Sequence, residues 1–212
     1  MTKIFAHRGA SAYAPENTME AFELAAKQGA DGIELDVHVT KDGEVVVTHD
    51  EKIDRVSNGR GFIKDMTLRE LKRLSFHNHM ESYVGAGIPT LREVLEYVST
   101  TNMDVNIELK TGIYWYPQIE EKTAFIVQET GMHDRVIYSS FNHHSIAKIK
   151  EIDSTAETAW LFSDVILNVE QYAKANSVEG LHPAVYHMYM SDFMKRWNES
   201  GEKVRVLSLI HI

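Results

Sequence analysis

Apolar and polar residues alternate along the chain in two rhythms. Short runs rich in β-branched residues, such as "GIELDVHV" and "EVVVTHD", separate longer stretches with an apolar residue every three or four positions. The first rhythm is typical of strands and the second of amphipathic helices. Strands are predicted at residues 3–7, 31–39, 45–49, 104–110, 135–141, 157–162, 178–182 and 203–210. Helices are predicted at residues 18–28, 67–75, 91–101, 117–130, 143–152, 165–176 and 191–200.

This alternation of strands and helices predicts a parallel α/β fold, which is either a closed barrel or a doubly wound sheet. A dinucleotide-binding sheet would need G-x-G-x-x-G after its first strand, and "AHRGASA" lacks that motif. The pattern therefore favours a TIM-type (β/α) barrel. One unit is irregular, because the turn in "TKDGE" predicts a hairpin there instead of a crossover. The segment at about 51–88 has turns and one short helix, which predicts a small inserted subdomain within a single domain spanning 1–212.

The first helix has the clearest predicted ends. Asn17 is the predicted N-cap, with Glu20 three residues later, and Gly29 is predicted to end the helix.

Composition narrows the possible classes of protein. The 212 residues are 43% hydrophobic and 25% charged, which fits one globular domain with a substantial core. No stretch approaches the roughly 20 apolar residues of a membrane helix, and the first residues lack a signal-like apolar run. We therefore expect a cytoplasmic protein without an integral membrane segment. Because the chain has no cysteine, disulfides and thiolate chemistry are excluded, and any metal must bind to oxygen or imidazole.

The net charge of −9 restricts the partners of the chain. Proteins that bind nucleic acid or anionic membranes in general use broad basic surfaces, so neither partner is expected. A small anionic substrate would have to be held by local cations.

Ionisable residues recur at the ends of the predicted strands. Because side chains alternate across a strand, Glu34, Asp36 and His38 share one face, and apolar residues occupy the other. Glu108 and Lys110 likewise share one face of the strand that contains them.

Two histidines complete this pattern. His7 ends the first predicted strand and His49 ends the third. Strand ends converge at one mouth of a barrel, where catalytic residues are found. A single histidine at a strand end is usually an ordinary hydrogen-bonded residue. Four strand ends that all place ionisable groups on the interior face favour a functional site, because burying unpaired charge is costly.

The residue types indicate a chemistry. Glu34, Asp36 and Glu108 offer the oxygen ligands that one divalent cation, Mg²⁺ or Ca²⁺, prefers. With Arg8 and Lys110 they leave a formal charge of −1, which a divalent ion changes to +1. The loaded site would attract an anion such as a phosphate, which Arg8 can grip with two hydrogen bonds. The two histidines suit general acid and base work near neutral pH. The inferred reaction is metal-assisted cleavage of a phosphate ester.

The motifs "HRG…PENT", "ELDVHVTKDGEVVVTHD", "IELK", "SSF" and "LHP" occur in this order along most of the chain. This set resembles the glycerophosphodiester phosphodiesterase family, which is related in plan to the phosphoinositide-specific phospholipases C. The resemblance implies a TIM-type barrel with an inserted subdomain after the His-Asp strand. It also implies hydrolysis of glycerophosphodiesters to glycerol 3-phosphate and an alcohol, with Mg²⁺ or Ca²⁺.

The resemblance also assigns roles by matching position. It implies that His7 and His49 are the acid/base pair, that Arg8 and Lys110 hold phosphate, and that Glu34, Asp36 and Glu108 bind the metal.

Further residues are predicted to line the site. The resemblance suggests Glu16 and Asn17, although helix capping alone would also explain Asn17. The aromatic cluster after "ELKTG", with Tyr114 and Trp115, and Phe141 after "SS" either shape an alcohol pocket or cap the barrel core.

The chain departs from the family pattern at "VRVLSLIHI", where relatives continue with a helix and a last strand. The expectation is a barrel that lacks its C-terminal end, with weakened activity and a homodimer formed through the exposed edges. Alternatives are lysophospholipase D type activity, which needs an apolar channel, and a protein that binds metal and substrate with little turnover. A sphingomyelinase-like toxin is disfavoured because neither a signal nor cysteines are present. Head group, native metal and the choice between a cyclic phosphate and direct water attack stay open.

Overall fold

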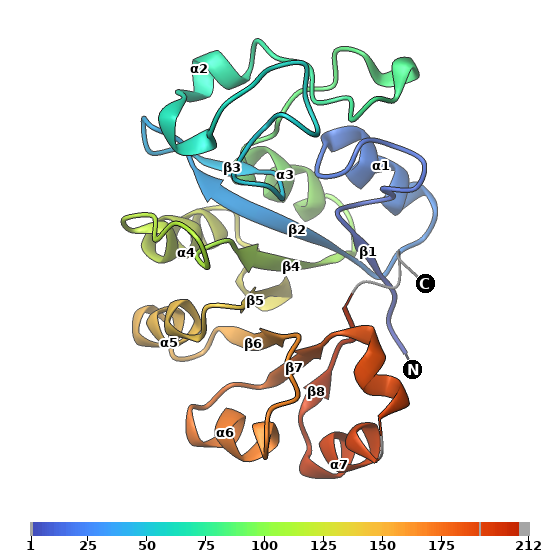
Figure 1. Cartoon of the computed structure of the whole chain (residues 1–212), viewed down its shortest axis with the longest axis vertical. Coiled ribbons are helices and arrows are strands. Elements are labelled where there is room, and N and C mark those ends of the chain that lie inside the picture. Colours follow the sequence, from blue (N-terminus) through green and yellow to red (C-terminus); the bar gives the residue numbers. More distant parts are fainter. Residues whose placement is uncertain (1, 191, 208–212) are drawn as a thin grey trace.

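The fold is a curled, mostly parallel sheet with helices packed on its outer face. It is seen in a computed structural model that describes residues 2–190 and 192–207. In Figure 1 the strands β2, β4, β5, β6, β7 and β8 follow one another down the molecule, and β3 lies above β2. Hydrogen bonds join the strands in the order β1-β2-β4-β5-β6-β7-β8, with β3 attached to β2. The strands are β1 (Phe5–His7), β2 (Gly32–Val39), β3 (Val45–Val47), β4 (Asp104–Leu109), β5 (Val136–Ser140), β6 (Glu157–Phe162), β7 (Gly180–Pro183) and β8 (Lys203–Val204).

The described part of the chain has seven α-helices, which lie between these strands in sequence. They are α1 (Met19–Lys27), α2 (Leu68–Leu71), α3 (Leu91–Ser99), α4 (Ile119–Glu129), α5 (His143–Ile152), α6 (Val169–Ala175) and α7 (Phe193–Ser200). Short 3-10 helices occupy Ile63–Asp65, Glu81–Tyr83, His133–Arg135 and Val185–Tyr189. Across the described part of the chain, no helix has both the length and the apolar character needed to span a membrane.

The predicted elements are confirmed in kind and order, and most are shorter than expected, although β6 and α5 have the predicted bounds and β7 continues to Pro183. The helix expected at 67–75 is only one turn long, because it ends with Lys72 as C-cap. The strand expected at 203–210 is described as Lys203–Val204, and its positions 208–210 lie outside the described residues, as does residue 191.

All neighbouring strands of the sheet run parallel except β3, which returns antiparallel to β2. Between residues 2 and 207, leaving aside 191, β1 and β8 are the two ends of the sheet and do not pair with each other. The expected α/β fold is thus confirmed as a curled parallel sheet. The expectations about a missing last unit and about the inserted subdomain stay predictions.

The main core lies between the sheet and the helices. Strand β2 is buried along its whole length, and its outward residues Ile33, Leu35 and Val37 belong to the same apolar cluster as Phe22 of α1 and Leu95 of α3. The outward face of β2 therefore supplies apolar packing. Its inward residues, Glu34, Asp36 and His38, are free to carry polar chemistry.

The N-terminus of α1 corrects one prediction. The N-cap is Thr18, whose side chain accepts a hydrogen bond from the backbone of Ala21. Asn17, the expected cap, has a φ of 57° and turns its side chain toward the strands. The capping rule placed the start of the helix within one residue, and the hydroxyl of the neighbouring Thr18 accepts the capping hydrogen bond in place of an asparagine amide oxygen.

Part of the 51–88 segment has a small apolar core of its own. This segment, which contains α2, lies at the top of Figure 1. A second apolar cluster joins it to β3 and consists of Val46, Ile53, Val56, Ile63, Leu71, Phe76 and Ile88. The segment is therefore packed as a unit against the β2–β3 hairpin.

Candidate active site

Three carboxylates meet on the inward face of the sheet. Glu34 and Asp36 project from β2, and Glu108 projects from β4, which pairs with β2 so that Asp36 lies opposite Glu108. One oxygen from each residue lies within 4.8 Å of the others, and all three residues are buried. The parallel pairing of two strands thus brings together side chains that are far apart in sequence.

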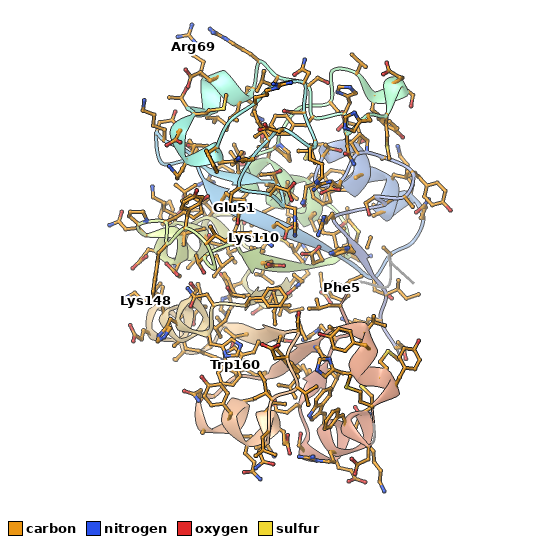
Figure 2. The ribbon with its side chains drawn as sticks, viewed as in Figure 1. Phe5, Glu51, Arg69, Lys110, Lys148 and Trp160 are labelled. Carbon is orange, nitrogen blue, oxygen red and sulfur yellow. The ribbon has the colours of Figure 1, made fainter. Side chains whose placement is uncertain are left out.

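Two cationic residues lie against this carboxylate cluster. Lys110 Nζ is 2.8 Å from a Glu108 oxygen and 3.6 Å from Asp36 Oδ1. Lys110 is labelled in the middle of Figure 2, beside β4. Arg8 Nε is 3.6 Å from Asp36 Oδ2, and the backbone N–H of Arg8 donates to Glu34 Oε2 at 3.0 Å. The cluster and its cations therefore form one buried charged network.

Burial and mutual repulsion disturb the ionisation of these carboxylates. Burial, together with the nearby charges of Asp36 and Glu108, raises the pKa of Glu34 well above its usual range. Burial and the charge of Asp36 raise the pKa of Glu108 to about 7. Burial also acts to raise the pKa of Asp36, but Lys110 and neighbouring positive groups lower it on balance. The site thus holds more carboxylate than its own cations neutralise.

These residues fit a divalent cation. Three buried carboxylates at close range are a hard oxygen donor set, and a cation among them would offset the burial and the mutual repulsion that raise the pKa values of Glu34 and Glu108. Asp36 Oδ1 is buried and has no hydrogen-bond partner among the described residues, so it is available as a ligand.

His7 borders the cluster from β1. Strand β1 pairs with β2 so that His7 lies opposite Glu34, and its Nε2 is 3.7 Å from Glu34 Oε2. Burial and the adjacent positive charge of Arg8 lower the pKa of His7 to about 4. The imidazole of His7 is therefore neutral at pH 7.

His49 reaches the same place by a different route from the one expected. Because β3 runs antiparallel to β2, the hairpin carries the chain back toward Asp36, and the backbone N–H of Thr48 bonds to the carbonyl of Asp36. His49 follows directly. The rule that parallel strand ends converge therefore explains His7 and Glu108 but not His49, which depends on the return strand.

Two residues that sequence reasoning did not single out hold His49 in place. His49 Nδ1 bonds to Asp50 Oδ1 at 2.6 Å, and Arg55 Nε bonds to the other Asp50 oxygen at 2.7 Å. A carboxylate only accepts hydrogen bonds, so Nδ1 of His49 carries a proton and Nε2 is the ring nitrogen that Asp50 leaves free. The "HD" pair gave a signal for Asp50. Nothing in the local pattern marked Arg55.

Arg55 also ties the predicted lining residue Glu16 into the network. Its guanidinium bonds to both oxygens of Glu16 at 2.9 and 2.7 Å, and Arg8 Nη1 bonds to Glu16 Oε1 at 3.0 Å. Glu16 therefore lies between the cation predicted to hold phosphate and the segment that supports His49.

Asn17 lies beside the carboxylate cluster. Its side-chain amide donates to Asp36 Oδ2 at 2.8 Å, and its amide oxygen is buried without a hydrogen-bond partner in the described part of the chain.

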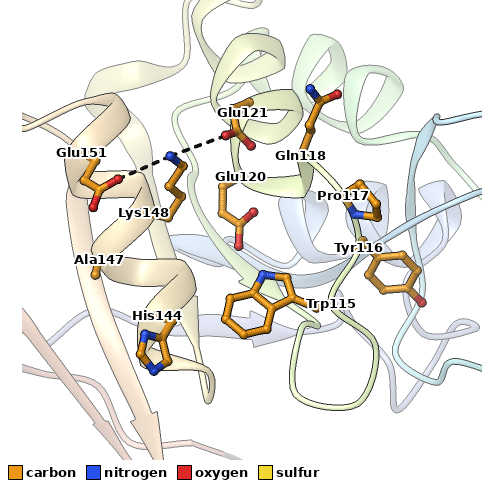
Figure 3. A pocket seen from close by; sticks show the side chains of 10 residues that line it. All are labelled: Trp115, Tyr116, Pro117, Gln118, Glu120, Glu121, His144, Ala147, Lys148 and Glu151. Atoms are coloured by element: carbon orange, nitrogen blue, oxygen red, sulfur yellow. Dashed lines mark hydrogen bonds and ion pairs between the residues drawn. The ribbon is translucent and has the colours of Figure 1, made fainter.

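The three predicted aromatic lining residues lie in different surroundings. Tyr114 packs edge-on against Phe62, with ring centroids 5.9 Å apart. Phe141 is 47% exposed. Trp115 is 65% exposed and borders a separate pocket of about 410 Å³ between α4 and α5, where Figure 3 shows its indole beside Glu120 and His144. Whether these aromatic residues shape an alcohol pocket or cap the barrel core stays a prediction.

Comparisons with known proteins show the family to which the chain belongs. A model of the glycerophosphoryl diester phosphodiesterase family matches residues 7–207. A protein of Bacillus altitudinis named glycerophosphodiester phosphodiesterase is 48% identical over 187 residues, which cover 87% of this chain and 76% of that protein. A protein of the same name from Caldanaerobacter subterraneus subsp. tengcongensis is 44% identical over 204 residues, or 96% of this chain and 84% of that protein.

Solved structures share the fold. A glycerophosphodiester phosphodiesterase from Agrobacterium tumefaciens is 31% identical with a TM-score of 0.85, covering 97% of this chain and 86% of that chain. An Oleispira antarctica phosphodiesterase in complex with the product sn-glycerol-3-phosphate is 27% identical with a TM-score of 0.91, covering 99% of this chain and 85% of that chain. The chain belongs to the glycerophosphoryl diester phosphodiesterase family of phosphoric diester hydrolases.

Proposed function

We propose that this chain hydrolyses glycerophosphodiesters to glycerol 3-phosphate and an alcohol, with the help of one divalent cation, Mg²⁺ or Ca²⁺. One water molecule is consumed, the phosphorus–oxygen bond to the alcohol breaks, and the leaving oxygen takes up a proton. The observation that supports this most is the cluster of Glu34, Asp36 and Glu108 next to Arg8 and Lys110. The names of the similar proteins, and the product bound in one of them, point to the same substrate class.

The carboxylate cluster would hold the cation. A bound divalent cation supplies charge stabilisation to a phosphate and lowers the pKa of a nearby hydroxyl group or water. Arg8 and Lys110 are proposed to bind the phosphate oxygens, Arg8 through paired hydrogen bonds and Lys110 as a point charge.

His7 and His49 are proposed as the acid/base pair. Burial keeps His7 neutral at pH 7, so it is able to take up a proton. The bond from His49 Nδ1 to Asp50 leaves Nε2 of His49 to exchange a proton with the substrate. One histidine would take a proton from the attacking oxygen and the other would protonate the leaving alcohol.

The test is release of glycerol 3-phosphate from glycerophosphocholine, measured with Mg²⁺, with Ca²⁺ and with a chelator. Release is expected only with a cation, and Glu34→Gln is expected to abolish it by removing a ligand. Glu129→Gln, on the exposed surface of α4, is the matched control and should keep the wild-type rate. Release that is equally fast in chelator would contradict the proposed cation site. Absence of release by folded, cation-binding protein would favour the binding-only alternative.

The acid/base assignment has its own variants. His7→Ala and His49→Ala are each expected to lower kcat by about a hundredfold or more, the usual contribution of a general acid or base. Cation binding should persist in both variants, because neither histidine is a proposed ligand. Near wild-type rates in both would show that the histidines are not the acid/base pair.

The lysophospholipase D alternative is supported by exposed apolar side chains on the loops that follow the strands. Trp115, Leu167 and Tyr189 are 65%, 85% and 76% exposed. A preference for lysophosphatidylcholine over glycerophosphocholine would favour this alternative, and the reverse preference would exclude it as the main activity.

Homodimer formation is also part of the proposal. In the described residues, β1 and β8 are unpaired sheet edges, and such edges can pair with another chain. Analytical ultracentrifugation that finds only monomer would remove this element of the proposal.

A further inference from the structure

His38 is fully buried at the inward side of β2, and both of its ring nitrogens are engaged. Nε2 lies 3.0 Å from the backbone carbonyl oxygen of His49, and Nδ1 lies 2.9 Å from Tyr116 Oη. A carbonyl oxygen only accepts, so Nε2 of His38 carries the proton. In a neutral ring, Nδ1 is then the acceptor of the tyrosine hydroxyl proton.

Tyr116 brings a second part of the chain to this contact. It is buried, lies in the loop between β4 and α4, and packs edge-on against His38, with ring centroids 5.6 Å apart. The same loop begins at Lys110. The His38–Tyr116 pair therefore fastens the loop that follows Glu108 and Lys110 to the peptide unit of His49.

Aromatic contacts continue outward from this pair. Tyr116 is 6.3 Å from Tyr114 between ring centroids, and Tyr114 is 5.9 Å from Phe62 of the 51–88 segment. His49 is thus held from two sides, with Asp50 on its ring and His38 on its backbone.

We propose that His38 and Tyr116 are positioning residues for His49, which fix its peptide carbonyl and so the point from which its imidazole reaches the substrate. This inference rests on the proposed acid/base role of His49. It adds two residues that do not themselves touch the phosphate, the cation or the reacting atoms.

The experiment measures kcat and KM for glycerophosphocholine in the Mg²⁺-loaded protein. Tyr116→Phe keeps the ring and removes the hydroxyl, and is expected to lower kcat about tenfold, as for one hydrogen bond that holds a reacting group, with little change in KM. His38→Leu loses both hydrogen bonds and should lower kcat further. His38→Gln can still donate to the His49 carbonyl, so partial recovery relative to His38→Leu is expected.

A double-mutant cycle separates positioning from general stability. If Tyr116 acts through His49, adding Tyr116→Phe to His49→Ala should not lower the residual rate further. Tyr97→Phe on α3 is the control for loss of a tyrosine hydroxyl away from the site, and should leave kcat unchanged. All rates are taken below the unfolding temperature of each variant.

Two results would overturn the inference. One is an unchanged kcat in folded Tyr116→Phe and His38→Gln. The other is that Tyr116→Phe lowers kcat by the same factor in the wild-type protein and in His49→Ala. A wild-type rate in His49→Ala alone would instead remove the acid/base assignment on which the inference depends, and the two failures are therefore distinguishable.

Discussion

The carboxylates are the residues whose places follow most directly from sequence. Strict alternation along β2 and β4 puts Glu34, Asp36 and Glu108 on one face, and parallel pairing brings them together. The contribution of Arg55 could not be predicted in this way. It lies in the irregular 51–88 segment, and its bonds to Glu16 and Asp50 depend on how that segment folds back over the site.

The pKa of Glu108 predicts how the affinity for a cation depends on pH. Its pKa is raised to about 7, first by burial and then by Asp36, so it is largely protonated below pH 7. A cation bound at the proposed site would have to displace that proton. Cation affinity is therefore expected to weaken as pH falls below 7, approaching about tenfold per unit for this one group. Titration calorimetry with Mg²⁺ or Ca²⁺ at pH 8 and pH 6 checks this expectation.

A Glu108→Gln variant provides the comparison, because it has no proton to displace at this position. Its affinity is expected to be lower overall but less dependent on pH. An equally steep dependence in both proteins would show that Glu108 does not hold the proton.

Helices and strands were predicted well where a single spacing of apolar residues runs through the whole segment. They were predicted less well where a turn determines where the element begins or ends. The hairpin in "TKDGE" followed from turn chemistry, and β3 forms as expected. The functional value of its reversal, which returns His49 to Asp36, depends on tertiary pairing. The cap of α1 fell on Thr18 because Asn17 bonds to Asp36, a competing partner that no local rule reveals.

The turn between β1 and α1 supports a prediction about stability. Gly9 has a φ of +80°, and a Cβ there would lie 2.7 Å from the backbone carbon of Ala21. Gly29 has nearly the same φ, +79°, but no atom within 4 Å of such a Cβ. Gly29→Ala is expected to cost about 1 kcal/mol in free energy of unfolding from backbone strain alone, and Gly9→Ala is expected to cost more.

Urea unfolding of both variants measures the difference. Equal losses would mean that the turn shifts enough to admit the methyl group, and that the close approach of helix α1 to Gly9 is not rigid.

For the whole molecule, the sequence predicted the α/β class and the polar inward face of the sheet, because each strand has a recognisable pattern of apolar and polar residues of its own. The curvature of the sheet and its pairing order depend on contacts between distant segments. His182 on β7 is an example of a residue whose surroundings come from a distant segment. It is 1% exposed, and Arg205, which follows β8, lies 3.4 Å from its Nε2. Its Nδ1 has no hydrogen-bond partner in the described residues.

His182 should make folding stability depend on pH. Burial and then the charge of Arg205 lower its pKa to about 3, whereas an unfolded histidine titrates near 6.5. As pH falls, the unfolded chain therefore takes up a proton on His182 before the folded chain does. The contribution of the buried neutral His182 to the free energy of unfolding is complete above pH 6.5 and is lost as pH falls toward 3. Below pH 6.5 the loss approaches about 1.4 kcal/mol per pH unit.

Denaturant unfolding of wild type and His182→Gln between pH 7 and pH 5 provides the measurement. The variant should be less stable at pH 7 but lose less stability on acidification, because all other titrating groups are common to both proteins. Parallel curves would show that His182 is protonated without cost in the fold.

The proposed residues are unevenly distributed along the chain. Apart from Phe141, every residue assigned to cation, phosphate, proton transfer or the site wall lies between His7 and Tyr116, on β1 to β4 and their loops. Strands β5 to β8 and their helices form the other half of the sheet. We therefore expect that changes in the second half can alter the surface around the departing alcohol while the proposed reaction centre stays intact. Diversification of head-group choice among relatives should accordingly concentrate after β4, and chimaeric proteins joined there are the natural way to exchange it.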